Sequence, residues 1–409
     1  MPKTVLLVGT FDTKCDEFGF VRDLILARGH EVLLLDAGVA GEPRITPDIS
    51  SDEVARAGGS SLEELRRQGD RGRAVDVMIA GVKELVPKLF EEGKFDGMLS
   101  LGGGAGTNIG TAGMRELPVG VPKVMVSTLA SGDVRPFVDV KDITMIYPVV
   151  DIAGLNKLSR RILANAAGAV CGMAEQEMPA AEEKPLVAAT MFGVTTPCVN
   201  AVREKLGQEG YEVVVFHATG TGGRAMEGLI KDGYFQAVAD LTTTEWADQV
   251  VGGVLSAGPE RMEAAAKAGI PQVVSAGALD MVNFHALDTV PERFKNRTLY
   301  KHNPTVTLMR TTPDECREIG RRIAGKLNGS KAPVILLLPL RGVSAIDREG
   351  QPFHHPEADR ALFESLKTHV NSSVQVIELD QHINDPEFAD VAAGTLLKVL
   401  NECALKNYT

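Results

Sequence analysis

The sequence predicts an α/β protein with two doubly wound, mainly parallel, Rossmann-like domains, related by internal duplication and separated by an interdomain cleft. Three observations support this prediction. Most apolar runs are continuous rather than alternating, which is typical of strands covered by helices on both faces. Helical stretches separate these runs along the whole chain, as in a doubly wound sheet. The second half of the sequence also repeats the first.

Nine continuous apolar runs are expected to form buried strands. They are Val5–Val8, Val32–Leu35, Gly97–Leu101, Lys123–Ser127, Leu186–Ala189, Val213–Phe216, Ala237–Leu241, Gln272–Ser275 and Val334–Leu338. A tenth strand, Val374–Leu379, is interrupted by Gln375 and Glu378, so we expect it nearer a sheet edge. Helices are expected over residues 52–68, 73–90, 157–173 and 315–327.

The internal repeat is clearest where residues 21–37 match residues 202–218. Each segment has the pattern of a helix, a glycine turn and an apolar strand. Val21, Arg22, Gly29, Glu31, Val32 and Ala37 recur at one offset as Val202, Arg203, Gly210, Glu212, Val213 and Ala218. Two units of one design would leave a cleft between them, and small ligands commonly bind in clefts between domains.

A polar segment that contains a proline, residues 175–184, marks the expected domain boundary. We therefore predict an N-terminal Rossmann-like domain over residues 1–183 that binds nucleotide phosphate. The C-terminal Rossmann-like domain, residues 184–409, is expected to bind a second substrate or to close over the site.

Composition excludes several classes of protein. The net charge of −11 argues against a nucleic-acid-binding surface, which needs a basic face to neutralise phosphates. No apolar run approaches the roughly 20 residues of a membrane span, and the first residues lack the pattern of a signal peptide. The five cysteines are scattered, which suits a reducing cytoplasm. We expect a cytoplasmic protein without a nucleic-acid or membrane partner.

The strongest local motif is the glycine-rich loop after the strand Gly97–Leu101. Gly102, Gly103, Gly104, Ala105, Gly106 and Thr107 precede an expected helix. Such a turn leaves backbone N–H groups free for an anion, and the helix N-terminus adds a favourable dipole. We predict that these residues bind nucleotide phosphates; the alternative is a tight turn with close packing. The loop is similar to the Gly-Gly-Asp-Gly-Thr loop of NAD and diacylglycerol kinases, but Ala105 replaces its acidic residue.

The first strand-to-helix turn is expected at the same edge of the sheet. Gly9, Thr10 and Thr13 are candidate cofactor contacts, Lys14 is a candidate phosphate ligand with a catalytic role, and Asp12 is a candidate catalytic residue that holds Mg²⁺. A helix cap with solvated charges is the alternative. Asp36 ends the second strand, where Rossmann-type folds place an acid on a ribose, so it is a further candidate.

The C-terminal domain carries a parallel set of polar loops. Arg224 lies in the glycine-rich segment 218–227 and could bind a carboxylate or phosphate, while Glu245 and Asp280 follow the next two strands. These three residues are candidate catalytic groups. The alternative is that the loops only cap helices.

Cysteine and histidine give weaker candidates. Cys198 is expected near a helix N-terminus, which would stabilise a thiolate, although a buried small residue is the commoner explanation. His354, His355 and His382 lie in loops that could reach the site. The chain has no paired histidines at helical spacing for a transition metal.

Five motifs together carry a resemblance that spans the whole chain. They are Gly-Thr-Phe-Asp-Thr-Lys at 9–14, Ser-Leu-Gly-Gly-Gly-Ala-Gly-Thr at 100–107, Ala-Thr-Gly-Thr-Gly-Gly-Arg-Ala-Met-Glu at 218–227, Gly-Ala-Leu-Asp-Met-Val-Asn-Phe at 277–284 and Asp-Gln-His-Ile-Asn-Asp-Pro at 380–386. The chain resembles the uncharacterised bacterial and fungal proteins related to the ATP-binding domain of the tomato mosaic virus resistance protein, the Tm-one-like family. The resemblance implies two α/β subdomains, ATP binding and homodimers or higher homo-oligomers.

The leading functional hypothesis is an ATP-binding protein that uses ATP and Mg²⁺ on a small acidic metabolite in the interdomain cleft. The reaction would be phosphoryl transfer or ATP-driven activation, catalysed by an ATP-dependent transferase or ligase. A non-catalytic module that responds to ATP and changes a partner surface is the first alternative. A sugar-nucleotide enzyme with two Rossmann domains is the second.

Overall fold

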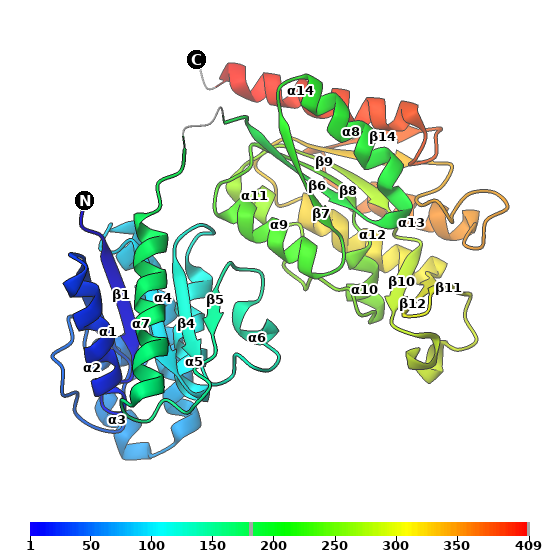
Figure 1. Cartoon of the computed structure of the whole chain (residues 1–409). Helices are drawn as coiled ribbons and strands as arrows, with labels where there is room; N and C mark the ends of the chain where they lie inside the picture. Colours follow the sequence, from blue (N-terminus) through cyan, green and yellow to red (C-terminus); the bar gives the residue numbers. More distant parts are fainter. Residues whose placement is uncertain (180–182, 407–409) are drawn as a thin grey trace. The chain divides into compact units, whose positions relative to one another are not determined.

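The computed structural model of the protein describes residues 1–179 and 183–406. The chain forms two compact units, Met1–Ala180 (unit 1) and Ala181–Thr409 (unit 2), and each is described by itself. Both are layered α/β structures (Figure 1). In the described ranges, no helix is long and apolar enough to cross a lipid bilayer.

Unit 1 is built on a five-stranded parallel sheet in the order β2-β1-β3-β4-β5. The bounds are β1 Thr4–Gly9, β2 Glu31–Asp36, β3 Gly97–Gly102, β4 Lys123–Ser127 and β5 Thr144–Ile146. β3 and β4 are buried along their entire length. Their continuous apolar sequences therefore reflect helices on both faces of the sheet.

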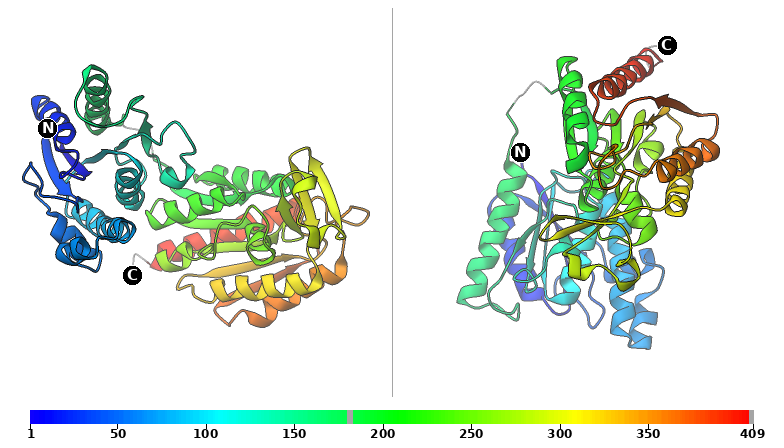
Figure 2. Two further views of the ribbon diagram at one scale, coloured as in Figure 1. Left: turned by 90° about the horizontal axis from the view of Figure 1, so that it is seen from below. Right: turned by 90° about the vertical axis from the view of Figure 1, so that its right-hand side faces the viewer.

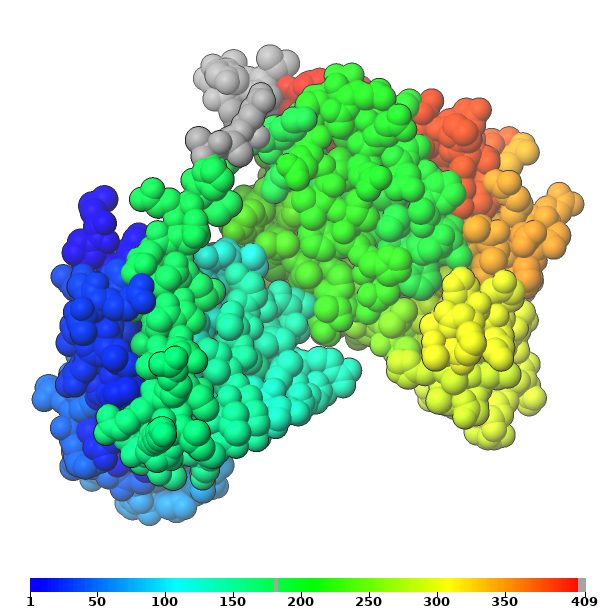
Figure 3. Space-filling view, in the orientation of Figure 1, coloured from blue at the N-terminus to red at the C-terminus, as the bar shows by residue number. Residues whose placement is uncertain are grey.

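Among the described residues of unit 1, seven helices surround this sheet: α1 Cys15–Ala27, α2 Ser51–Ala57, α3 Leu62–Gln68, α4 Arg71–Glu91, α5 Gly104–Glu116, α6 Arg135–Val138 and α7 Lys157–Glu175. Apolar side chains of α1 and α7 pack on one face of the sheet, and those of α2 to α5 pack on the other. Figure 2 shows these two helical layers, and Figure 3 shows α7 beside the blue N-terminal segment on the surface. α4 and α5 thus lie next to the strand ends that form the site described below.

Unit 2 contains a six-stranded parallel sheet in the order β14-β13-β9-β8-β6-β7. The strands are β6 Leu186–Met191, β7 Glu212–His217, β8 Ala237–Thr242, β9 Gln272–Gly277, β13 Val334–Pro339 and β14 Val374–Leu379. β14 is an edge strand, as its interrupted apolar pattern predicts. The order β7-β6-β8-β9-β13 corresponds to β2-β1-β3-β4-β5, so the sequence repeat is also a repeat of topology.

Helices cover both faces of the second sheet. The bounds are α8 Thr196–Gln208, α9 Thr221–Lys231, α10 Glu245–Val251, α11 Ala264–Ala268, α12 Pro313–Leu327, α13 Pro356–His369 and α14 Pro386–Lys406. α8 and α14 pack together on one face, while α9 to α13 pack on the other. Short 3₁₀ turns lie at Gly193–Thr195, Leu287–Thr289 and Glu292–Phe294.

The structure confirms the predicted fold class and all ten predicted strands, with ends that differ by no more than a few residues. Two elements were missed: the short edge strand β5, and a three-stranded antiparallel sheet in unit 2 (yellow in Figure 3). The strands of the small sheet are β10 Met281–Phe284, β11 Leu299–Asn303 and β12 Val306–Arg310. Their apolar runs are too short to stand out from loop sequence.

The single helix predicted over residues 52–68 was wrong, because α2 and α3 are separate. Gly58 packs against α4 so closely that a Cβ there would lie 2.0 Å from the carbonyl oxygen of Val77. Gly59 has a φ of +85°, which glycine adopts without steric cost. Ser61 then caps α3 by accepting a hydrogen bond from the Glu64 backbone. The break places Leu65 of α3 at the pocket described next.

Candidate functional site

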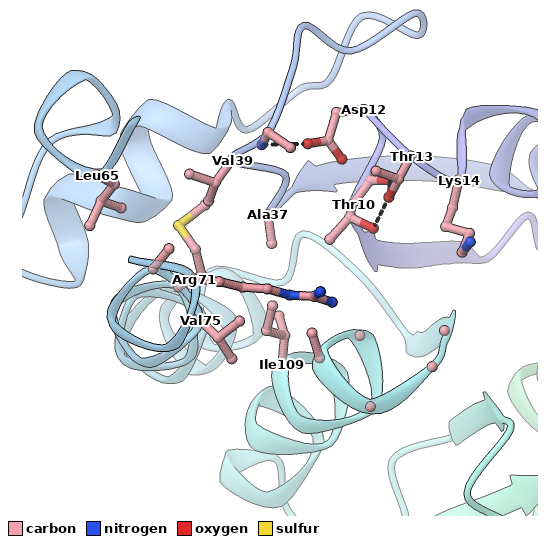
Figure 4. Close-up of a pocket in the computed structure, with 18 of the residues that line it drawn as sticks. Thr10, Asp12, Thr13, Lys14, Ala37, Val39, Leu65, Arg71, Val75 and Ile109 are labelled. Carbon is pink, nitrogen blue, oxygen red and sulfur yellow. Dashed lines mark hydrogen bonds between the residues drawn. The ribbon is translucent and has the colours of Figure 1, made fainter. Parts of the chain in front are cut away.

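A pocket of about 790 Å³ opens at the carboxyl edge of the sheet in unit 1 (Figure 4). Its wall combines the loops after β1, β2 and β3 with side chains of α3, α4 and α5. The chain runs from β1 outward to β2 and later returns to β3 on the other side of β1. The pocket therefore lies at the switch point of the strand order, which is where open α/β sheets bind ligands.

The N-terminus of α5 faces this pocket and has no cap of its own. The N-cap residue Gly103 offers no side chain, and the first hydrogen bond of the helix runs from Thr107 N–H to the carbonyl oxygen of Gly103. The N–H groups of Gly104, Ala105 and Gly106 have no acceptor among the residues that the structure describes. Free amides and the helix dipole together favour an anion at this point.

The glycines of this loop are not all needed for the fold. Gly102 is needed, because a Cβ there would lie 2.9 Å from Gly106 Cα. Gly104 has nothing within 4 Å of its Cβ position, and Gly103 has only Thr128 Oγ1 at 3.7 Å. Neither residue has a positive φ. Side chains at both positions are thus sterically permitted, and their absence leaves the amides of the loop open to the pocket.

Three cationic residues line the same pocket, and the side chains of two of them, Lys14 and Arg71, have no partner in the described part of the chain. Lys14 follows β1, and Arg71 begins α4. In the described part of the chain, neither side chain forms an ion pair or hydrogen bond. Figure 4 shows the Arg71 guanidinium projecting across the pocket toward the side that carries Thr10 and Lys14. By contrast, the guanidinium of Arg66 is already engaged by Glu42 and by the carbonyl oxygens of Val39 and Gly41.

Asp12, Thr10 and Thr13 lie in the wall as predicted, but they also bind within the protein. Asp12 Oδ2 accepts hydrogen bonds from the N–H groups of Ala40 at 2.7 Å and Gly41 at 3.1 Å. Asp12 Oδ1 is buried and has no partner among the described residues. The hydroxyls of Thr10 and Thr13 lie 2.9 Å apart. Asp12 therefore orders the loop after β2 through one carboxylate oxygen.

Three predicted contacts do not line the pocket. Asp36 is 1% exposed, and its Oδ1 accepts hydrogen bonds from Phe11 N–H and Gly38 N–H. Burial raises the pKa of Asp36, although these hydrogen bonds oppose the shift. Thr107 is buried with its hydroxyl 2.7 Å from that of Ser127, and Gly9 is required because Phe18 occupies the space of a Cβ. These residues support the loops from behind.

Sequence reasoning missed Arg71, Asp151 and the aliphatic end of the pocket. Leu65, Val75 and Ile109 line this end together with other apolar residues of α3, α4 and α5. Asp151 reaches the wall from the segment between β5 and α7. The neighbouring Val149 has a φ of +66°, a strained value for a β-branched residue, and it is 64% exposed. No motif marks these positions, because distant parts of the chain converge there.

The glycine-rich loop of unit 2, between β7 and α9, differs because its anion position is filled by the protein. Glu245 Oε1 accepts hydrogen bonds from the N–H groups of Gly220 at 2.7 Å and Gly223 at 3.0 Å. Glu245 is only 1% exposed. A candidate catalytic acid in the sequence, it acts in the structure as an internal cap for α9.

Arg261 joins this cap to a buried ionic network. It is 2% exposed and contacts Glu245 at 2.7 Å, Asp240 at 2.6 and 2.7 Å, and Glu227 at 3.3 Å. Burial lowers the pKa of the Arg261 guanidinium, but the surrounding carboxylates outweigh burial and raise it. Glu227 also accepts hydrogen bonds from three N–H groups at the start of α11. Arg261 and its three carboxylates thus all have hydrogen-bond partners inside the protein.

Asp280 and Arg224 are not brought together with Glu245 in a single pocket. Asp280 is buried and accepts a 2.7 Å hydrogen bond from Ser344, and burial raises its pKa to about 6. Arg224 is exposed on α9. A pocket of about 800 Å³ in unit 2 lies at the ends of β13 and β14, and none of these three residues lines it.

His355, His382 and Cys198 have structural explanations, whereas His354 lines a pocket of unit 2. His382 is 2% exposed, its Nε2 donates to the Ser344 carbonyl oxygen at 2.8 Å, and its Nδ1 accepts from Asn384 N–H. His354 borders the pocket at β13 and β14, and His355 caps α13. Burial raises the pKa of the Cys198 thiol to about 12, which favours the thiol over the thiolate. Within the described ranges, no group of three or more His, Cys, Asp and Glu could hold a metal ion.

Comparison with known proteins assigns the chain to a family. The model of the uncharacterised protein family UPF0261 N-terminal domain matches residues 3–179, and that of the UPF0261 C-terminal domain matches residues 184–400. The chain therefore belongs to the UPF0261 family. It is 55% identical over 404 residues to a UPF0261 protein of Clostridium tetani, with 98% of this chain and 100% of that protein covered.

A plant relative is longer. The chain is 39% identical over 418 residues to the ToMV resistance protein Tm-1(GCR237) of Solanum lycopersicum, and the match covers 97% of this chain but 55% of the tomato protein. Among solved structures, UDP-N-acetylglucosamine 2-epimerase from Rickettsia bellii matches with a TM-score of 0.24 and 12% identity, over 98% of this chain and 96% of that one. A score this low carries no argument about the ligand.

Proposed function

We propose that unit 1 binds ATP in its pocket, with the phosphates on Gly102–Gly106. The observation that carries this proposal is the uncapped N-terminus of α5, where the N–H groups of Gly104, Ala105 and Gly106 lack acceptors among the described residues. Phosphate oxygens are strong acceptors and suit this arrangement of amides and helix dipole. Side chains at Gly103 and Gly104 would obstruct such a ligand without being excluded by the fold.

The charges around the loop agree with a polyphosphate. Lys14 and Arg71 line the pocket without partners in the described ranges, so two positive charges are available to the ligand. Mg²⁺ binds proteins through one or two carboxylates together with substrate phosphates and water. The unpartnered Oδ1 of Asp12 fits such a role, and Asp151 supplies a second carboxylate in the same wall. When bound, Mg²⁺ would neutralise phosphate charge.

The pocket supports binding more strongly than turnover. One oxygen of Asp12 is committed to the N–H groups of Ala40 and Gly41, so Asp12 already has a structural role in the loop after β2. Three further points stay predictions. They are the use of ATP on a small acidic metabolite, the alternative of a regulatory role without catalysis, and the formation of a homodimer. Cleavage of ATP that appears only when an acidic metabolite is added would favour the enzyme over the regulatory module.

Isothermal titration of ATP, with and without Mg²⁺, tests the proposal on the full chain. The wild type should bind ATP, and Gly104→Val should lose the binding because its side chain occupies the phosphate position. Gly172→Val is the matched control, since Gly172 is also a helical glycine of unit 1 with nothing within 4 Å of its Cβ position. Circular dichroism verifies that both variants fold.

The proposal fails if the wild type does not bind ATP, or if folded Gly104→Val binds as well as the wild type. Titration of a UDP-sugar in parallel distinguishes the ATP-binding protein from the alternative of a sugar-nucleotide enzyme. Tighter binding of the UDP-sugar than of ATP would favour the sugar-nucleotide enzyme.

A further inference from the structure

The end of the pocket away from the glycine loop is aliphatic. α3 contributes Leu65 to this end, α4 contributes Val75 and Met78, and α5 contributes Ile109. Ala37, Val39, Ala40 and Ala74 complete the apolar lining. Figure 4 shows Leu65, Val39 and Val75 on one side of the pocket, with Thr10, Thr13 and Lys14 on the other. The pocket is thus divided into an aliphatic half and an anion-binding half.

Apart from Arg71, whose guanidinium projects toward the side of Thr10 and Lys14, the polar side chains next to the aliphatic half are hydrogen-bonded within the protein. Arg66 binds Glu42 and the carbonyl oxygens of Val39 and Gly41. Asp70 caps α4 by accepting a hydrogen bond from Arg73 N–H at 3.1 Å. The N–H groups of Ala74 and Gly69 donate to carbonyl oxygens within their own segments. These groups are therefore used to order the α3–α4 turn.

Bases are told apart by hydrogen bonds to their edges, since their ring faces are similar. A site that hydrogen-bonds a substrate group can reject an analogue by about 10⁴-fold, whereas aliphatic contact discriminates far less. Burying an exocyclic amine or carbonyl against aliphatic side chains without a partner would also cost free energy. A base in this half would consequently lay its face on the wall and keep its polar edge toward solvent.

We infer that the pocket takes nucleoside triphosphates with little regard to the base, which is held by its ring face against Leu65, Val75 and Ile109. This inference rests on the proposed function, because it assumes that the phosphates occupy Gly102–Gly106. The volume of about 790 Å³ is within the usual range for ligands of this size. Specificity then comes from the triphosphate, and the nucleoside adds affinity through contact.

Titration of the full-length protein with ATP, GTP, CTP, UTP and inorganic tripolyphosphate, each with Mg²⁺, tests the inference. The four nucleotides should bind within about tenfold of one another, as expected for contact without edge hydrogen bonds. Tripolyphosphate should bind at least about tenfold more weakly than ATP, because it has no ring to cover the aliphatic wall.

Two variants separate the halves of the pocket. Val75→Ala should weaken the binding of all four nucleotides by a similar factor and leave the affinity for tripolyphosphate unchanged. Arg71→Gln should weaken the binding of the nucleotides and of tripolyphosphate by similar factors, because it removes a positive charge beside the phosphates. Both positions are on α4, so a general disturbance of that helix would not produce this difference.

Each of the other possible outcomes would overturn either the inference about the base or the proposed function as a whole. ATP that binds more than about 100-fold more tightly than GTP, CTP and UTP would show an edge-reading site and overturn the inference, while ATP binding itself stands. Tripolyphosphate that binds as tightly as ATP would show that the wall does not contact the base. Failure of tripolyphosphate and all four nucleotides to bind would overturn the proposed function and the inference with it.

Discussion

The loop after β3 in unit 1 and the loop after β8 in unit 2 occupy equivalent positions in two sheets of related strand order. In unit 1 the position carries Gly102–Gly106, and the amides at the start of α5 are open to a pocket. In unit 2 it carries Thr242–Glu245, and all four residues are at most 1% exposed. Glu245 extends from there to the neighbouring glycine loop and binds the N–H groups of Gly220 and Gly223.

Glycine content alone therefore does not identify a ligand loop. The segments Gly102–Gly106 in unit 1 and Gly220–Gly223 in unit 2 are both rich in glycine. The glycines of the unit 2 segment are required because their Cβ positions are blocked, whereas the Cβ positions of Gly103 and Gly104 are open. What distinguishes the loops is whether the protein itself supplies an acceptor for the amides. Both units thus have the repeated fold. The amides at the start of α5 in unit 1 are open to a ligand, whereas those of Gly220 and Gly223 in unit 2 are occupied by Glu245.

The largest effect should follow from breaking the internal cap of unit 2. Glu245→Ala removes one carboxylate partner of the buried Arg261 and leaves the N–H groups of Gly220 and Gly223 without an acceptor. We expect a loss of about 3–5 kcal/mol in the free energy of unfolding, as for one partner of a buried ion pair. Urea denaturation followed by fluorescence of the single tryptophan, Trp246, measures it.

The control for this prediction is Glu292→Ala, whose side chain is 86% exposed in a surface pair with Lys295. It should cost less than about 1 kcal/mol. A Glu245→Ala protein that unfolds at the same urea concentration as this control would contradict the role of Glu245 as a cap.

A smaller effect on stability should distinguish Gly223, whose Cβ position is blocked, from Gly104, whose Cβ position is open. A Cβ at Gly223 would lie 2.1 Å from Glu245 Oε2, so Gly223→Ala should destabilise the protein by about 1–3 kcal/mol through overpacking. Gly104→Ala should instead gain up to about 1 kcal/mol, because its Cβ position is open and the residue is helical. Urea denaturation followed by circular dichroism compares the two variants, and equal destabilisation would remove the distinction.

The buried acids of unit 2 should also make its stability depend on pH. Burial raises the pKa of Asp248 to about 7, although Asn283 and Leu255 donate hydrogen bonds to it. Between about pH 4 and pH 7 the folded protein keeps a proton that the unfolded chain releases, so this residue lowers stability as pH rises. The slope should reach about 1.4 kcal/mol per pH unit.

Asp248→Asn cannot titrate at this position and should flatten that part of the pH profile. Urea midpoints measured by Trp246 fluorescence from pH 4 to pH 8 give the comparison. Profiles of the wild type and the variant that run parallel would show that Asp248 has an ordinary pKa.

The smallest expected effect concerns the open loop of unit 1. Lys14→Gln should weaken ATP binding by about fivefold, close to 1 kcal/mol, because it removes one partly exposed charge beside the phosphates. The variant should also show a weaker dependence on salt. Lys94→Gln removes the same charge from an exposed position outside the pocket and should not change the affinity. Equal titration curves for the two variants would exclude contact between Lys14 and the ligand.

Much of this fold could be predicted from local patterns. The buried strands are continuous apolar runs, and the repeated Gly29 and Gly210 mark turns where φ is +83° and +89°. Thr10, Lys14 and Gly102–Gly106 were also correctly placed at one edge of the sheet, since parallel strands end together. The two-helix break at Gly58 was missed because it depends on close contact with Val77 of α4.

The sequence by itself determined three features of this protein. They are the alternation of helices with buried strands, the two related units, and the glycine loop at the end of a strand. These features depend on periodicity and backbone freedom, which neighbouring residues define. Only the tertiary structure decided which polar groups are already used. Glu245 and Asp36 are paired inside the protein, whereas Arg71 joins Lys14 at the pocket from far along the chain. Hydrogen bonds and burial between distant residues set that outcome, and sequence spacing does not record them.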